Sequence, residues 1–69
     1  MYLTIDMDLD NDAMHIEGDP DPDALAVAER LRTTADKIER HATLQLGDAG
    51  AIIDTNGNSL GSWIVVETL

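Results

Sequence analysis

The sequence predicts an α+β fold with the element order ββαββ, in which two hairpins form one antiparallel sheet and one helix packs on one face of it. Three patterns support this prediction: an alternating apolar and polar stretch at the N-terminus, an amphipathic stretch after two prolines, and a second alternating stretch around an Asn-Gly turn. A chain of 69 residues is expected to form a single domain, residues 1–69.

The first hairpin is predicted near the N-terminus, over residues 2–18. Its first strand has apolar residues at every second position, namely Leu3, Ile5, Met7 and Leu9. An Asp-Asn loop would place Met7 opposite Met14 on the apolar face and Asp6 opposite His15 on the other face. A slip of one residue would expose the apolar side chains, so the pattern favours this register.

The helix is predicted over residues 22–41. Asp21 is a suitable N-cap, and Pro22 fits the first helical position. Apolar residues then recur every three or four positions on one face, at Leu25, Ala28, Leu31, Ala35, Ile38 and Ala42. We expect this face to cover the sheet.

The second hairpin is predicted over residues 51–67, with its turn at Asn56-Gly57. The two faces of its second strand can be assigned in two ways. Regular alternation, which we expect, turns Trp63 and Val65 away from the helix. A bulge at Gly61 would instead place both residues in the core.

The charge of the chain favours a protein partner with a basic surface. Fourteen acidic residues oppose four basic ones, for a net charge of −10. This balance argues against direct binding to nucleic acid or to an anionic membrane, because both require a basic surface. No secretion signal or membrane span is visible, so a cytoplasmic location is expected. Cysteine is absent, which excludes disulfides.

The open face of the sheet is the predicted binding site. Trp63 and Tyr2 would be its aromatic anchors. The polar residues around them would be Asp6, Asp8, Glu17 and His15. We expect no enzymatic activity, because no nucleophile has a neighbouring base and no phosphate-binding loop occurs. Three alternatives stay open: an acidic face that only solubilises the chain, acids that mimic DNA phosphates, and a homodimer that hides the face.

A calcium site is a further alternative for the N-terminal acids. Five carboxylates follow the spacing of an EF-hand loop, namely Asp6, Asp8, Asp10, Asp12 and Glu17. However, Asn11 occupies the position that requires glycine, and only five residues precede Asp6, too few for an entering helix. The hairpin accounts for the same residues, so no metal and no cofactor are expected.

Two segments, "LRTTADKIERH" and "IIDTNGNSLGSW", resemble short accessory proteins of actinobacterial phages and prophages. These proteins have a helix followed by a hairpin of the pattern DxNGNxxGxW. The resemblance covers about residues 31 to 63 and implies no catalytic or binding residue. It implies a setting, that of an accessory phage gene product acting inside a bacterial host. Our hypothesis for the chain in that setting is that it binds a host protein and inhibits or redirects it.

Overall fold

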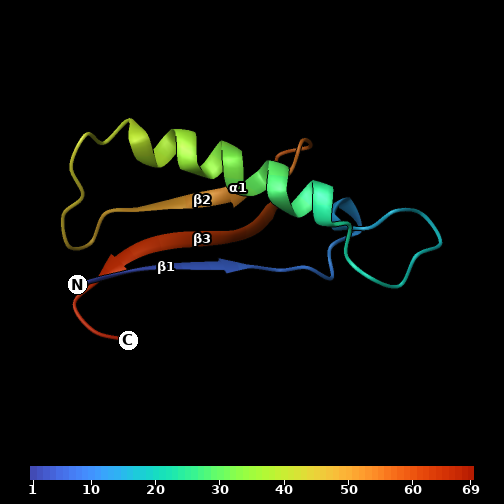
Figure 1. Ribbon diagram of the computed structural model, residues 1–69, viewed down its shortest axis with the longest axis horizontal. Helices are drawn as coiled ribbons and strands as arrows, with labels where there is room; N and C mark the ends of the chain where they lie inside the picture. The colour runs from blue at the N-terminus through green and yellow to red at the C-terminus, as the bar shows by residue number, and fades with distance from the viewer.

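A computed structural model describes residues 1–69 as one helix beside a three-stranded antiparallel sheet (Figure 1). The elements follow one another as β1 (Tyr2–Met7), the short 3₁₀ helix η1 (Asp12–Met14), α1 (Ala24–Glu39), β2 (Ala49–Ile53) and β3 (Ser59–Val66). The strand order is β1-β3-β2, so the last strand of the chain lies in the middle of the sheet. The α+β class and the antiparallel sheet are confirmed. Only one strand precedes the helix, however, so the order ββαββ is wrong.

The predicted first hairpin, residues 2–18, does not form. β1 pairs instead with β3, from Tyr2 opposite Val66 to Met7 opposite Gly61. Beyond β1, side chains accept hydrogen bonds from the backbone two positions ahead, as Asp8 does from Asp10 N (2.8 Å). Asn11 and Asp19 do the same for Ala13 and Asp21. These local turns compete with a strand ladder, and they explain why the chain leaves the sheet after Asp8, whose N–H still donates to the Leu60 carbonyl of β3.

The helix begins two residues later than predicted. Asp23 is the N-cap, and its side chain accepts from Leu25 N at 3.2 Å. Pro22 precedes the helix and forms an isolated bridge with His15. Neither α1 nor η1 has the length and apolar character that crossing a bilayer requires.

The face that α1 turns toward the sheet also differs from the predicted stripe. Thr34 is buried there, and its hydroxyl donates to the Arg30 carbonyl (2.8 Å), which satisfies the polar group inside. Val27 and Ile38 pack beside it against the core. Leu25 and Leu31 of the predicted stripe are exposed. The reason is that α1 lies mainly along β2 and covers only part of the sheet (Figure 1).

Trp63 lies in the core with 2 % of its surface exposed, so its expected place on the open face is wrong. The register of β2 against β3 shifts between Ile52 and Ile53, which leaves Leu60 as an extra residue on β3. This bulge puts Leu60 on the same side as Trp63 and Val65, as the alternative assignment required. Gly61 permits it, since a Cβ there would come within 1.8 Å of the Asp6 carbonyl oxygen on β1.

The indole of Trp63 occupies space that any other residue at Gly50 would fill. Gly50 lies directly opposite Trp63 on β2. A Cβ at Gly50 would come within 2.5 Å of the indole Nε1. His41, just beyond α1, packs edge-on against the same indole, with ring centroids 5.3 Å apart. The core is closed by Met14 of η1 and Ile52 of β2.

Gly50→Ala should therefore overpack the core. We expect it to lower the free energy of unfolding by about 1–3 kcal/mol, measured by urea denaturation followed by circular dichroism. The matched control is the same change in a Trp63→Phe background, where the clashing indole atoms are gone and the cost should fall by at least half. An equal cost in both backgrounds would contradict the steric explanation.

Candidate functional site

The predicted binding residues do not form one surface. Tyr2 and Asp6 lie on β1 with their side chains on the face away from α1, as expected. Trp63 is buried on the other face and cannot serve as an exposed anchor. Asp8 follows β1, and its carboxylate caps a turn. His15 and Glu17 lie in residues 8–23, outside the sheet.

The open face of the sheet is more apolar than predicted. Cross-strand neighbours share a face, so the register assigns to it Tyr2, Thr4, Asp6, Ala49, Ala51, Ile53, Ser62, Ile64 and Val66. Ile64 lies in the middle strand between Thr4 and Ala49, and it is 38 % exposed. Tyr2 is 50 % exposed at one end of the face. The result is an apolar surface with a single acid, Asp6, in place of an acidic ring around a tryptophan.

A second exposed apolar surface lies on the helix side of β1. Leu3 and Ile5 pair with Val65 and Trp63, yet they are 46 % and 44 % exposed. The sequence suggested that both residues were core, because alternation identifies the face but not how far a helix extends over it. α1 lies along β2, at the far side of the sheet from β1 (Figure 1).

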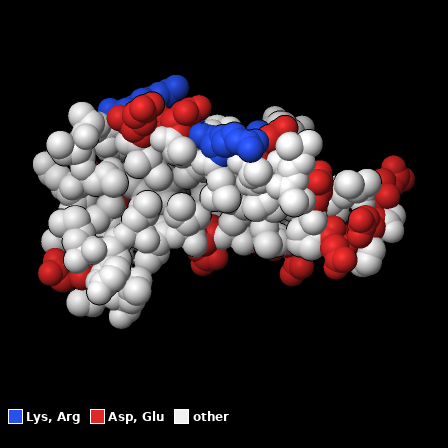
Figure 2. All heavy atoms as spheres, viewed as in Figure 1, with Lys and Arg blue, Asp and Glu red and all other residues white.

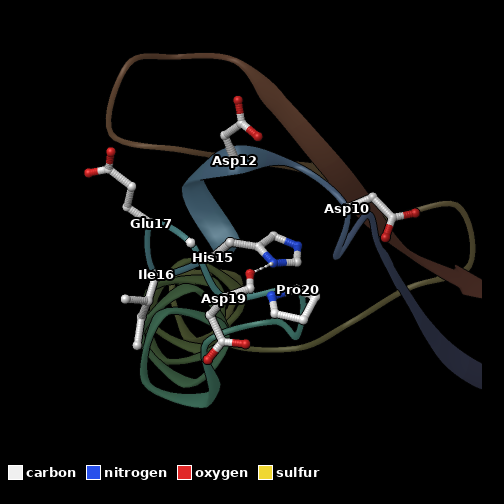
Figure 3. Close-up of a pocket in the computed structure, with 8 residues that line it drawn as sticks. Asp10, Asp12, His15, Ile16, Glu17, Asp19 and Pro20 are labelled. Atoms are coloured by element: carbon white, nitrogen blue, oxygen red, sulfur yellow. Dashed lines mark hydrogen bonds between the residues drawn. The ribbon is translucent and has the colours of Figure 1, made fainter.

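The segment 8–23 encloses an acidic hollow of about 600 Å³ at the end of the molecule away from the termini (Figure 3). It is lined by Asp10, Asp12, His15, Ile16, Glu17, Gly18, Asp19 and Pro20. The carboxylates in Figure 3 point in different directions. Nowhere in the chain do three His, Cys, Asp or Glu side chains come together in a way that could hold a metal ion. The five carboxylates of the EF-hand spacing do not converge on one point. Asp6, for example, lies in β1, outside the segment that holds the other four.

His15 has a different partner from the one predicted. Its Nε2 lies 2.7 Å from the Leu9 carbonyl oxygen. Its Nδ1 lies 3.4 Å from the carbonyl oxygen of Asp19, the contact drawn in Figure 3. The ring therefore links the beginning and the end of the loop, whereas the predicted partner Asp6 is in the sheet. The sequence offered no signal for this, because both acceptors are backbone atoms.

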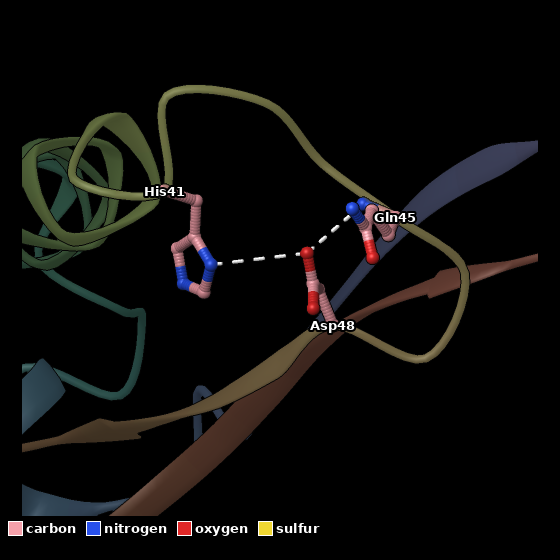
Figure 4. A network of polar contacts seen from close by, with 3 residues as sticks. All are labelled: His41, Gln45 and Asp48. Carbon is pink, nitrogen blue, oxygen red and sulfur yellow. Dashed lines mark hydrogen bonds and ion pairs between the residues drawn. The ribbon is translucent and has the colours of Figure 1, made fainter.

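His41 and Asp48 connect the end of α1 to the start of β2. His41 Nδ1 lies 3.8 Å from Asp48 Oδ2, an ion pair when the imidazole is protonated (Figure 4). The same carboxylate oxygen accepts from Gln45 N at 2.9 Å. Together with the contact between His41 and Trp63, this arrangement holds the connection over the core.

Charge is distributed unevenly over the surface. All four basic residues belong to α1 or its C-cap, at Arg30, Arg32, Lys37 and Arg40. In the view of Figure 2 the basic side chains lie with several acids along the margin that α1 forms, whereas the only charged side chains visible at the β1 margin and at the end formed by residues 8–23 are acids. An approaching cation is therefore attracted toward the β1 side of the molecule.

No family model matches the chain, and no curated protein or solved structure is significantly similar to it.

The carboxylate of Asp54 stabilises the β2–β3 turn. It is buried at the start of the β2–β3 turn, where its Oδ1 accepts from Asn56 N (2.8 Å) and Asn58 N (2.9 Å). Its Oδ2 accepts from the Asn58 side chain at 3.3 Å. The hydrogen bond from the Asn58 backbone is the main cause that holds the pKa of Asp54 below its ordinary value of 3.8, against the opposing effect of burial. The motif "DTNGN" predicted the turn but not this role.

Asp54→Asn should destabilise the chain in a pH-dependent way. Because the carboxyl has a lower pKa in the folded state than in the unfolded state, its stabilisation is present above the ordinary value of 3.8 and is lost as the pH falls through the folded-state pKa. We expect Tm to fall by about 5 °C at pH 7, and the difference from the parent to shrink below pH 4. Thermal melts from pH 2 to 8 measure this, with the exposed Asp36→Asn as the control. A difference that does not change with pH would contradict it.

Proposed function

We propose that the chain is a small non-enzymatic binding protein that holds a partner protein with a basic surface against its open sheet face. The observation that supports this best is the one-sided cover of the sheet. α1 lies on one face, and no element of the chain covers Tyr2 and Ile64 on the other (Figure 1). Exposed aromatic and aliphatic side chains that share one face are typical of protein interfaces.

The electrostatic character of the chain supports a basic partner. The net charge is −10, and the basic residues are confined to α1 and its C-cap. Long-range attraction would bring a basic protein to the side of the molecule away from the helix and increase the association rate. The apolar residues of the open face would then supply the short-range contact.

The biological setting that we propose comes from the resemblance to phage accessory proteins. In that setting the chain acts in the cytoplasm of an actinobacterial host, binds a host protein and inhibits or redirects it. A small acidic chain suits this task, because it needs only to occupy a surface that the partner uses for something else.

The open face can be tested with matched variants. The tagged chain is used to capture proteins from an actinobacterial lysate, and the affinity of each captured protein is then measured with purified components. We expect the double change Tyr2→Ala and Ile64→Ser to weaken binding by at least tenfold. The control is Leu25→Ala on the outer side of α1, where Leu25 is also exposed and should have no effect.

The same measurement at low and high salt separates this proposal from DNA mimicry. A contact centred on Tyr2 and Ile64 should lose little affinity in salt and should not be displaced by DNA. Steep salt dependence together with competition by DNA, and with full binding by the double variant, would replace the proposal with phosphate mimicry.

A further inference from the structure

The outer edge of β1 has unpaired backbone groups. Asp8 N donates to the Leu60 carbonyl of β3 at 2.7 Å. Hydrogen bonding alternates along an antiparallel strand, so the even-numbered residues of β1 bond to β3. The N–H and C=O groups of Leu3, Ile5 and Met7 therefore point away from the sheet. β1 is an edge strand, and no hydrogen bond from a turn or loop reaches these three residues.

The other edge of the sheet is protected. On β2 the carbonyl of Ile53 accepts from Arg30 Nη1 at 3.4 Å, and α1 lies along the strand. β1 has no such cover. It contains no proline, lysine or bulge, which are the usual means of keeping an edge strand from pairing.

Two of the three residues with free backbone groups, Leu3 and Ile5, also have exposed apolar side chains, whereas Met7 is partly buried against the core. Leu3 and Ile5 lie on the helix side of the sheet, next to the buried Val65 and Trp63. A strand added beside β1 would place alternate side chains against Leu3 and Ile5, and would so extend the apolar surface of the sheet beyond β1. Backbone pairing would supply affinity, and these contacts would select apolar residues at every second position.

The charge around β1 determines which residue types the added strand would have on the open face. Asp6 is exposed on the open face, opposite Ser62 of β3. The β1 margin in Figure 2 shows acids and no basic side chain. A second copy of this chain would bring another net charge of −10 to the same edge. A strand with lysine or arginine at alternate positions would bring the opposite charge to Asp6.

We propose that the β1 edge binds an extended segment of the partner, with alternating apolar and basic residues, as a fourth strand of the sheet. This proposal rests on the proposed function, since it specifies how a basic partner protein is held. Apolar side chains of the segment lie beside Leu3 and Ile5, and its basic side chains lie on the side of Asp6. The segment is recognised by its alternation and not by one particular sequence.

The probe is a blocked peptide of seven residues that alternates valine and lysine. Hydrogen exchange of single amides is measured by NMR in the free chain and with the peptide. In the free chain the amides of Leu3 and Ile5 should exchange rapidly, while those of Thr4 and Asp6 are protected by β3. With the peptide, exchange at Leu3 and Ile5 should slow by at least tenfold and exchange at Thr4 and Asp6 should stay the same.

Two control peptides and two variants make the test specific. A peptide with the same composition in two blocks, and one with glutamate in place of lysine, should leave the exchange rates unchanged. Ile5→Pro removes only an outward N–H, which an edge strand tolerates, and should abolish binding. Asp6→Lys reverses the charge of an exposed residue and should weaken binding by at least tenfold, even if the proline variant fails to fold.

The outcomes separate this proposal from the proposed function. If a host protein binds and depends on Tyr2 and Ile64, but Leu3 and Ile5 still exchange rapidly, the edge proposal is overturned and the function stands. If the block peptide bound as tightly as the alternating peptide, the edge proposal would also be overturned, because binding would then depend on charge attraction alone. Protection of Leu3 and Ile5 without peptide, with a dimer in sedimentation, would assign the edge to a second copy. Failure of every basic probe and every host protein would remove both proposals.

Discussion

The contact between Trp63 and the bare backbone of Gly50 is the constraint on which the rest of the structure depends. The indole fits only because the residue opposite it has no side chain. The bulge at Leu60 then brings Leu60 to the same side of β3, so the central strand supplies three of the five buried apolar residues, the third being Val65. β1, β2 and α1 are arranged around this strand, and each buries its own apolar residues only by contacting it or its neighbours.

The core is centred on β3, and the single helix α1 covers only part of the sheet. α1 follows β2, and its Thr34 and Ile38 reach the core, while β1 stays beyond the helix. The consequence is that Leu3 and Ile5 pair with buried residues and are themselves nearly half exposed. Chains of this size bury too little apolar surface to be very stable alone, and contact with a partner is one of the usual compensations. Incomplete cover is thus both a limit on stability and the source of the available binding surfaces.

The sequence predicted the local parts of the fold and failed on the non-local ones. The β2–β3 hairpin was predicted because Asn56-Gly57 determines a turn between neighbouring segments. Alternation in β1 identified a strand but not its partner, which lies nearly sixty positions later in β3. The face of Trp63 depended on a one-residue bulge, and such a shift reverses every side chain after it. Of the candidate site, Tyr2 and Asp6 were placed on the correct face because their position depends on alternation alone.

The acidic residues fall into two groups, those whose carboxylates accept backbone hydrogen bonds and those whose carboxylates do not. Five of the fourteen accept backbone hydrogen bonds in turns or at the helix cap, namely Asp8, Asp19, Asp23, Asp48 and Asp54. These carboxylates are needed where they are, because each satisfies N–H groups that the chain would otherwise leave unpaired. Their charge still adds to the field around the molecule, but at least one oxygen of each carboxylate already accepts a backbone hydrogen bond. Asp6 has no such bond and lies on an edge strand, so it can meet a basic side chain without breaking a turn.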